Sequence, residues 1–235
     1  MYLFSPIGLR TPSNRSFIIN EIPRHFGYQP VRLDLPTISA DDICQPGAIE
    51  LVEIKPENGN VSVLELAILA KLIARFKPRR IFEFGTFDGR TTLNMAVNAP
   101  AATVYTLDLP RSDMNSTNLP VESADRTYID KSASGRRFAG SEHGNRIVQL
   151  YGDSATFDYT PYAGNIDFIF VDGAHSFEYV SSDSAKALQM LAKDGVIAWH
   201  DYASWPGATK ALNALYRAGL HLRWIEGTSL AVRVE

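Results

Sequence analysis

The sequence predicts an α/β fold: a three-layer domain built on a doubly wound, mostly parallel sheet with an antiparallel C-terminal edge. Two observations predict it. From residue 61 onward, short apolar runs alternate with helical stretches, and the runs lack the strict polar alternation of half-exposed strands, which is typical of parallel strands covered on both faces. The last two runs are joined only by Glu226, Gly227 and Thr228, and so short a connection indicates a hairpin.

Each predicted element has its own signal. The first helix lies in VSVLELAILAKLIARF, which places Leu64, Ile68 and Leu72 on one stripe before Pro78 ends it. The predicted strands are Arg80–Phe84, Thr103–Leu107, Arg146–Leu150, Ile166–Val171 and Gly195–Trp199, followed by the hairpin strands His221–Ile225 and Ser229–Val234. The helices predicted between them are Thr91–Val97, Glu178–Leu191 and Ala208–Ala218.

The chain divides by texture into two predicted regions. Residues 1–60 are rich in Pro, Asn and Gly with little periodicity, so we expect an N-terminal extension or cap that contacts substrate or a second subunit. Residues 61–235 form the predicted main domain. Within it, residues 110–145 have no sustained apolar period, and so long a segment is either a surface insertion or a lid over a binding site.

Charge and composition exclude several classes of function. A net charge of −3 gives no electrostatic case for a nucleic-acid or membrane partner. Cys44 is the single cysteine, which excludes an internal disulfide and a multi-cysteine metal site. No apolar run is long enough for a membrane helix, and the N-terminus lacks the apolar stretch of a signal peptide. We therefore expect a cytoplasmic protein.

Three consecutive strands end in residues that suit a nucleoside-containing ligand. IFEFGTFDGR runs from a strand through Gly85 and Gly89 into a helix, so the backbone can approach a ligand closely. Asp108 ends the next strand, where a carboxylate can accept hydrogen bonds from both ribose hydroxyls. Asp153 and Ser154 end the third, where they can read an adenine edge. Each signal alone also fits a structural turn, but all three are expected to converge on one crevice.

Two further strand ends carry acids beside imidazoles. Asp172 ends the fourth parallel strand with His175 in the turn that follows, and His200 and Asp201 end the fifth. A single histidine is most often structural. Two acids with two imidazoles can form a divalent-metal site or a general-base pair, and the residues alone leave these alternatives open.

Taken in order, these motifs resemble a known family. IFEFGTFDGRTT, LDLP, LYGDSATFDY, DFIFVDGAHSFEYV and LAKDGVIAWHDY look like class I S-adenosylmethionine-dependent methyltransferases, and most closely like bacterial small-molecule O-methyltransferases of the catechol and macrolide-sugar type. The resemblance covers Val61 to Glu235. It implies a Rossmann-like sheet of seven strands and an enzyme that transfers a methyl group from S-adenosyl-L-methionine to a hydroxyl of a small metabolite or sugar.

The resemblance also implies residue roles. The residues implied to contact the cofactor are Glu83, Gly85, Thr86 and Gly89 at its methionine end, Asp108 at the ribose, Asp153 and Ser154 at the adenine, and Asp172. Asp172 and Asp201 match the acidic magnesium ligands of the catechol-type enzymes, with His200 a further candidate ligand for Mg²⁺ or another divalent cation. Tyr202 stands where those enzymes have an amide ligand, which is a departure from the family pattern.

Two mechanisms and two other functions stay open at this stage. Either a metal at Asp172 and Asp201 activates the acceptor hydroxyl, or His175 or His200 removes its proton as a general base. One alternative function is a catalytically silent partner or sensor that binds S-adenosylmethionine. The other is a nucleotide-dependent oxidoreductase, against which the absence of a G-x-G-x-x-G motif speaks. The apolar, Pro-rich N-terminal segment is compatible with a homodimer.

Overall fold

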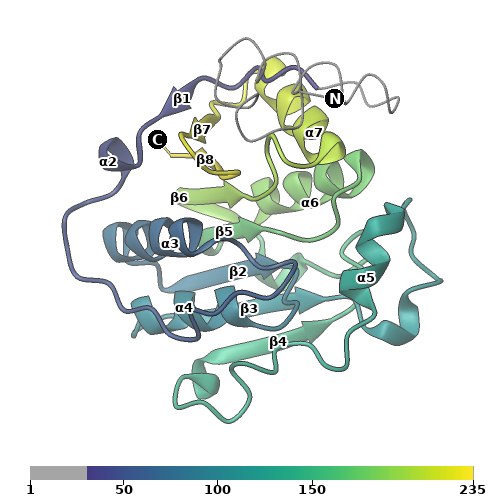
Figure 1. Ribbon diagram of the computed structural model, residues 1–235, viewed down its shortest axis with the longest axis horizontal. Coiled ribbons are helices and arrows are strands. Elements are labelled where there is room, and N and C mark those ends of the chain that lie inside the picture. Colours follow the sequence, from purple (N-terminus) through teal and green to yellow (C-terminus); the bar gives the residue numbers. More distant parts are fainter. Residues whose placement is uncertain (1–30, 235) are drawn as a thin grey trace, which may run out of the picture. The chain divides into compact units, whose positions relative to one another are not determined.

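The computed structural model describes residues 31–234 (Figure 1). The chain divides into two compact units, residues 1–32 and 33–235, and the elements discussed below all lie in the second unit. The expected contacts of residues 1–30 with substrate or a second subunit lie outside the described residues. Within the described part of the chain, no helix has the length and apolar character needed to cross a membrane.

An eight-stranded sheet forms the middle layer (Figure 1). Its order from edge to edge is β1 (Thr37–Ile38), β7 (Arg223–Ile225), β8 (Ala231–Arg233), β6 (Leu191–Trp199), β5 (Ile166–Val171), β2 (Arg80–Phe84), β3 (Thr103–Asp108) and β4 (Ile147–Tyr151). Neighbours are parallel except at β8, which is antiparallel to both β6 and β7. The predicted fold class is confirmed, and β1 adds a two-residue strand beyond the predicted hairpin.

Helices cover both faces of this sheet. The helices are α2 (Ala40–Ile43), α3 (Val63–Phe76), α4 (Arg90–Asn98), α5 (Arg126–Ile129), α6 (Phe177–Met190) and α7 (Pro206–Arg217). Side chains alternate along each strand, so Ile81 packs with α3 and α4 while Phe82 packs with α6 and α7. The result is a core on each face, which explains why the parallel strands read as continuous apolar runs.

Capping residues fix where three of the helices begin. Ser62 and Glu65 form a capping box at the start of α3. Ser176 caps α6 by accepting a hydrogen bond from the backbone N–H of Tyr179 at 3.2 Å. Gly89 begins α4 with a φ of 85°, a left-handed conformation that other residues rarely adopt. These caps place the N-termini of α4 and α6 beside the carboxyl ends of β2 and β5.

Tyr202 anchors the chain segment that precedes β1. Its side chain is fully buried, and its hydroxyl accepts hydrogen bonds from the backbone N–H groups of Asp34 at 2.9 Å and Leu35 at 3.0 Å. The same hydroxyl donates to Oδ1 of Asn213 on α7 at 3.0 Å. Tyr202, which replaces an amide ligand of the resembled family, therefore serves the packing of this segment.

Residues 110–145 form an insertion made of short turns and the four-residue helix α5. The backbone N–H groups of Gly135 and Arg137 each donate to a carbonyl oxygen of the β2–α4 turn, Phe87 and Asp88 respectively, at 2.9 Å. Ordered hydrogen bonding of this kind attaches the insertion to the turn that follows β2.

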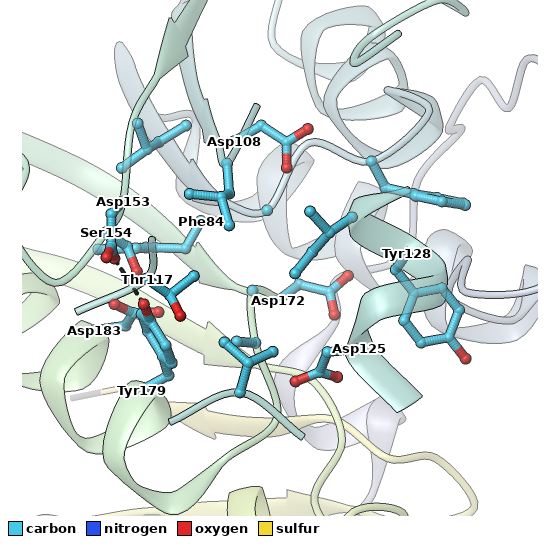
Figure 2. A pocket seen from close by; sticks show the side chains of 18 of the residues that line it. Phe84, Asp108, Thr117, Asp125, Tyr128, Asp153, Ser154, Asp172, Tyr179 and Asp183 are labelled. Carbon is cyan, nitrogen blue, oxygen red and sulfur yellow. Dashed lines mark hydrogen bonds between the residues drawn. The ribbon is translucent and has the colours of Figure 1, made fainter. Parts of the chain in front are cut away.

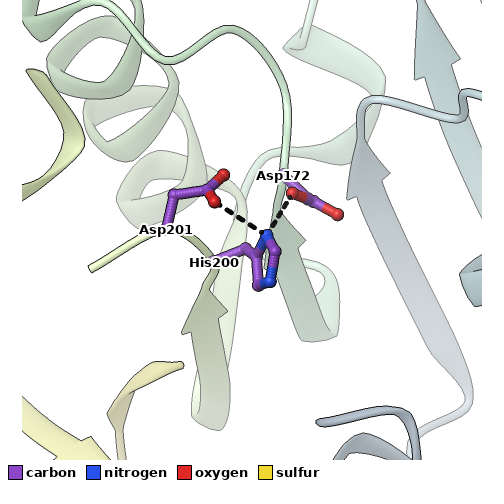
Figure 3. A group of neighbouring side chains, drawn as sticks. All are labelled: Asp172, His200 and Asp201. Atoms are coloured by element: carbon purple, nitrogen blue, oxygen red, sulfur yellow. Dashed lines mark ion pairs between the residues drawn. The ribbon is translucent and has the colours of Figure 1, made fainter. Parts of the chain in front are cut away.

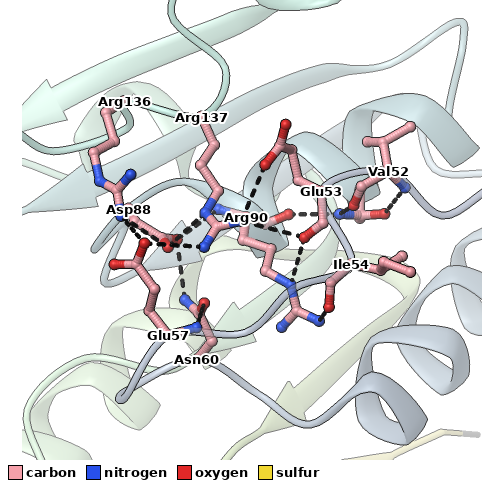
Figure 4. Close-up of polar contacts among 10 residues, drawn as sticks. Val52, Glu53, Ile54, Glu57, Asn60, Asp88, Arg90, Arg136 and Arg137 are labelled. Atoms are coloured by element: carbon pink, nitrogen blue, oxygen red, sulfur yellow. Dashed lines mark hydrogen bonds and ion pairs between the residues drawn. The ribbon is translucent and has the colours of Figure 1, made fainter.

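A buried arginine joins the β2–α4 turn to the segment that precedes α3 (Figure 4). The guanidinium of Arg90, which is fully buried, donates to the carbonyl oxygens of Glu53 at 3.0 Å, Ile54 at 2.9 Å and Val61 at 2.7 Å. Arg137 reaches the same region from the insertion, with its Nε 2.7 Å from Oδ2 of Asp88. Backbone dipoles and Asp88 thus compensate the buried positive charge.

Replacing Arg90 by Met should destabilise the protein strongly, because three carbonyl oxygens lose their donor. We expect the free energy of unfolding to fall by about 3 kcal/mol, measured by urea denaturation. Arg80→Met is the matched control, since Arg80 is exposed on β2, and it should change stability by less than about 0.5 kcal/mol. Equal stability of the two variants would show that the carbonyl contacts of Arg90 contribute nothing.

Candidate functional site

Two adjoining cavities lie at the carboxyl ends of the parallel strands. The first cavity runs between the ends of β2, β3 and β5, the start of α6 and the insertion (Figure 2). The second cavity lies between the β2–α4 turn, Asn60, Trp205 and the ends of β5 and β6. Both are lined by Gly85, Phe87, Tyr128, Asp172, Gly173 and His175. Because they share these residues, the two cavities lie side by side.

The turn after β2 passes directly over the end of β5. Gly85 has a φ of 86°, and a Cβ at this position would overlap the carbonyl oxygen of Asp172. Glycine is therefore required twice here, for its conformation and for its size. Gly89, the second glycine of the motif, would place a Cβ 2.6 Å from the ring of Phe138, so its small size accommodates the insertion.

Asp108 lies at the end of β3 and lines the first cavity. Its carboxylate is held by two residues of the insertion: Lys131, with Nζ 2.9 Å from Oδ2, and Ser134, whose hydroxyl donates to the same oxygen. Burial raises the pKa of Asp108, and the nearby Lys131 opposes that rise. The insertion therefore contacts the predicted ribose-binding acid directly.

Asp153 lies beyond the end of β4 and makes four hydrogen bonds. Oδ2 accepts from the backbone N–H and the side-chain amide of Asn118 at 2.7 and 2.9 Å. Oδ1 accepts from the backbone N–H of Ala155 and the hydroxyl of Tyr179, each at 2.9 Å. Four donors use the normal accepting capacity of a carboxylate. In this structure, Asp153 thus joins the insertion to α6.

Asp183 lies on α6, one turn after Tyr179, and also lines the first cavity. Burial raises the pKa of this carboxyl to about 7, although a hydrogen bond from Ser154 opposes the rise. Figure 2 shows Asp183 and Tyr179 next to Asp153 and Ser154 at one end of the cavity, with Asp125 and Tyr128 at the other. Sequence reasoning missed Asp183, although its spacing of three or four residues from Tyr179, Val180 and Ala187 places it on the buried face of α6.

Glu83 lies on β2, one residue before the carboxyl end of the strand, and is not among the residues that line the two cavities. Its side chain is buried and accepts hydrogen bonds from the hydroxyls of Thr92 on α4 and Thr106 on β3, the latter at 2.7 Å. Thr106 in turn contacts the hydroxyl of Thr86 at 2.7 Å. Burial raises the pKa of Glu83 to about 8, so the carboxyl is largely protonated at neutral pH.

Asp172, His200 and Asp201 converge at the second cavity (Figure 3). Nδ1 of His200 lies 3.0 Å from Oδ1 of Asp172 and 3.2 Å from Oδ1 of Asp201. On its other side, Nε2 of His200 lies 3.5 Å from Oε2 of Glu65. Asp201 has a φ of 68°, so its backbone is held in a strained left-handed conformation that is common at functional sites.

His175 extends this cluster towards the insertion. Its Nε2 lies 2.9 Å from Oδ2 of Asp201, and its Nδ1 is paired with Asp125 from the insertion. The imidazole also stacks on the indole of Trp205, with ring centres 4.1 Å apart and planes 11° apart. The cluster therefore alternates acids and imidazoles from Asp125 to Glu65.

The alternation sets the charge of each imidazole. Burial works against a charge on His175, but hydrogen bonds to Asp125 and Asp201 outweigh it and raise its pKa to about 10. Burial likewise disfavours a charge on His200, and the carboxylates of Asp172 and Asp201 nevertheless raise its pKa well above the usual value. Both imidazoles are therefore protonated at neutral pH in this arrangement.

The structure brings most of the predicted site residues together. The residues that line one or both cavities are Gly85, Thr86, Asp108, Asp153, Ser154, Asp172, His175, His200 and Asp201. Glu83 and Gly89 line neither cavity. Sequence reasoning did not find Asp125, Lys131 or Ser134 of the insertion. These residues lie in a segment without periodicity, and only the folded chain brings them to the strand ends.

Comparison with known proteins shows the family. The model of a family described as a methyltransferase domain matches residues 82–202, which is just over half of the 235 residues. The chain belongs to this methyltransferase family, and the resemblance to class I methyltransferases is confirmed. No curated protein matches the sequence.

Solved structures share the fold at low sequence identity. A Podospora anserina methyltransferase bound to S-adenosylhomocysteine is 18% identical, with 76% of this chain and 81% of that chain covered and a TM-score of 0.57. The O-methyltransferase TomG from Streptomyces achromogenes is 17% identical, with coverages of 78% and 92% and a TM-score of 0.53. A Bacillus cereus O-methyltransferase is 16% identical, with coverages of 76% and 84% and a TM-score of 0.53.

The buried Glu83 should make stability depend on pH. An unfolded glutamate titrates near 4.5 and Glu83 in the folded chain near 8, so between these values the folded protein holds a proton that the unfolded chain has released. Stability should therefore fall as pH rises through this range, by up to about 1.4 kcal/mol per pH unit. In Glu83→Gln this contribution disappears, and urea denaturation at several pH values between 5 and 8 should give a flatter profile.

Glu226→Gln serves as the control, because Glu226 is exposed and its substitution should leave the pH profile unchanged. A Glu83→Gln profile as steep as that of the wild type would contradict the protonated state of Glu83.

Proposed function

We propose that this methyltransferase transfers the methyl group of S-adenosylmethionine to a hydroxyl of a small metabolite or sugar, with a divalent cation held by Asp172, Asp201 and His200. The observation that carries this proposal is the convergence of these three side chains at the second cavity, where Asp172 also lines the first. The donor belongs in the first cavity, and the acceptor in the second.

The first cavity suits the methyl donor for three reasons. It begins at the Gly85 turn, where the backbone can approach a ligand closely, and it passes Asp108, a strand-end acid placed for ribose hydroxyls. Its other walls are largely apolar, from residues such as Leu107 and Val121, which suits a nucleobase. TomG was solved with S-adenosylmethionine and the Bacillus cereus enzyme with S-adenosylhomocysteine, and we extend that ligand class to this chain.

The residues present fit a divalent cation. Asp172, His200 and Asp201 each offer one ligand atom, and these atoms lie within 4.8 Å of one another. Two carboxylates and one neutral imidazole form a donor set that suits a metal such as Mn²⁺, whereas Mg²⁺ favours oxygen ligands alone. Because a ligating imidazole must be neutral, binding of the cation would displace the proton that His200 holds in its absence. A cation in this position supplies positive charge that lowers the pKa of an adjacent acceptor hydroxyl.

The hydrogen bonding of the imidazoles favours the metal-assisted mechanism over a histidine base. A general base needs a lone pair within reach of the proton that it removes. Both nitrogens of His175 face carboxylates, Asp125 on one side and Asp201 on the other. His200 is flanked in the same way by Glu65 and by the two acids of the cluster. We therefore assign His175 to positioning Asp201.

The remaining catalytic work is positioning and exclusion of water. Methyl transfer proceeds in line, so the rate depends on holding the sulfonium methyl and the acceptor oxygen in register. Phe87, Tyr128 and Trp205 give the second cavity aromatic walls, which suit the flat or apolar faces of a ring-shaped acceptor. The insertion contributes Tyr128 and, through Asp108 and Asp125, contacts both parts of the site.

A thermal-shift titration tests the donor and the cation separately. S-adenosylhomocysteine at about 100-fold excess over its Kd should stabilise the wild type by roughly 2.7 kcal/mol, and added Mn²⁺ or Mg²⁺ should raise Tm further until a chelator reverses the effect. Asp201→Asn should keep the ligand-dependent shift and lose the metal-dependent one. Methyl transfer to a panel of phenols and sugars, assayed with the same proteins, should fall at least 100-fold in Asp201→Asn, or ~2.7 kcal/mol in barrier.

Asp194→Asn is the matched control, because Asp194 is an exposed acid on β6, the strand that precedes Asp201. It should keep both shifts and full activity. Absence of a shift with S-adenosylhomocysteine would refute the donor assignment, whereas a ligand shift without any metal effect would refute the cation alone.

A further inference from the structure

Glu65, the glutamate of the α3 capping box, is buried and contacts three separate parts of the chain. The residue is 6% exposed and is not among those that line the second cavity. Oε1 accepts hydrogen bonds from the backbone N–H and the hydroxyl of Ser229, in the connection between β7 and β8, each at 2.7 Å. Oε2 accepts from the backbone N–H of Ser62 at 2.8 Å and lies 3.5 Å from Nε2 of His200.

These contacts exceed what a helix cap needs and fix the orientation of the carboxylate. A capping box requires an acceptor only for the backbone N–H of the N-cap residue, here Ser62. Ser229 adds two donors on the other oxygen. Because backbone N–H groups can only donate, both oxygens of Glu65 act as acceptors. The carboxylate is therefore held with an accepting oxygen, Oε2, turned towards the imidazole of His200.

The two ring nitrogens of His200 face different surroundings. Nδ1 lies 3.0 Å from Oδ1 of Asp172 and 3.2 Å from Oδ1 of Asp201, the two other proposed ligands of the cation (Figure 3). Nε2 faces Glu65 instead. A neutral imidazole has one N–H and one lone pair, and the hydrogen bond at one nitrogen decides which nitrogen keeps the lone pair. In metal sites, a carboxylate that accepts the second N–H of a ligating histidine fixes the orientation of the ring.

We propose that Glu65 is a positioning residue for the cation site: its Oε2 accepts the Nε2–H of neutral His200, so that the lone pair of Nδ1 faces Asp172 and Asp201. This inference rests on the cation of the proposed function. Without Glu65, the hydrogen would be favoured on Nδ1, where either aspartate can accept it, and the lone pair would point away from the site. Glu65 thus offers no ligand atom itself and acts through His200.

Glu65→Met tests this role, because Met keeps a long, unbranched, helix-favouring side chain and offers the imidazole only a weak acceptor. Calorimetric titration of the protein with Mn²⁺ should show binding roughly 10- to 100-fold weaker in Glu65→Met than in the wild type. Equal Mn²⁺ affinity of the two proteins would overturn the inference.

Glu65→Met also removes the capping box, so the control variant must weaken the helix start alone. Ser62→Ala is matched for this purpose, because it deletes the hydroxyl that accepts from the backbone N–H of Glu65 at 3.2 Å and leaves the Glu65 carboxylate in place. Ser62→Ala should lower the Tm and bind Mn²⁺ like the wild type. A loss of Mn²⁺ affinity as large as that in Glu65→Met would assign Glu65 to helix capping and contradict the proposal.

A double variant shows whether the effect passes through the imidazole. In His200→Asn, the shorter amide side chain has no atom at the position of Nε2, so Glu65 has no ring to position. Adding Glu65→Met to His200→Asn should then change the Mn²⁺ affinity by less than about 3-fold. If the second substitution weakens binding as much as it does in the wild type, Glu65 does not act through His200.

Nitrogen NMR of the Zn²⁺-loaded wild type gives an independent readout, since Zn²⁺ is diamagnetic and accepts the same ligand types. The ring signals of His200, identified by their loss in His200→Asn, should show the hydrogen on Nε2 and the ligating lone pair on Nδ1; the opposite assignment would overturn the inference.

The two proposals can fail separately. If neither Mn²⁺ nor Zn²⁺ binds the wild type, the proposed cation site fails and this inference with it. If Mn²⁺ binds the wild type and Glu65→Met equally well, the proposed function stands and only the role of Glu65 is refuted.

Discussion

The close passage of the Gly85 turn over the carbonyl of Asp172 is the constraint on which the rest of the site depends. Parallel pairing of β2 with β5 brings the two strand ends side by side, and only a residue without a Cβ lets the turn cross there. This crossing forms the shared wall of the two cavities. Asp172 therefore lines both cavities, which is the placement that the proposed methyl transfer between two bound molecules requires.

Charge compensation organises the second cavity. Burying an isolated carboxylate or imidazolium is costly, and here acids and imidazoles alternate so that each charge meets an opposite one. His200 stands between Asp172 and Asp201, and His175 between Asp201 and Asp125. A divalent cation fits this logic because it meets the same acids with positive charge. The arrangement also explains why the histidines are poor bases in this state, because both ring nitrogens of each imidazole already face carboxylates.

The insertion at residues 110–145 borders both cavities, and its residues bind the strand-end acids Asp108 and Asp153. Asn118 binds Asp153, and Lys131 with Ser134 binds Asp108. Asp125 of the same segment pairs with His175. Arg137 of the insertion is hydrogen-bonded to Asp88 in the β2–α4 turn, which borders the second cavity. Any movement of the insertion would therefore alter both cavities together.

The sequence by itself determined the fold class and the strand ends. Apolar runs such as Ile166–Val171 and the short C-terminal connection predicted the sheet, because strand formation and hairpin direction follow from local patterns. Parallel strands share one carboxyl edge, so the motif acids Asp108 and Asp172 could be placed near one another from topology alone.

Only the tertiary structure decided how these acids are used. Asp153 and Asp183 are both aspartates near the first cavity, yet one is surrounded by donors and the other has an oxygen without a hydrogen-bond partner among residues 31–234. Likewise, the partners of Asp108 and His175 come from a segment whose sequence has no periodicity. Hydrogen bonding and burial depend on residues that are distant along the chain, and local patterns do not encode those distances.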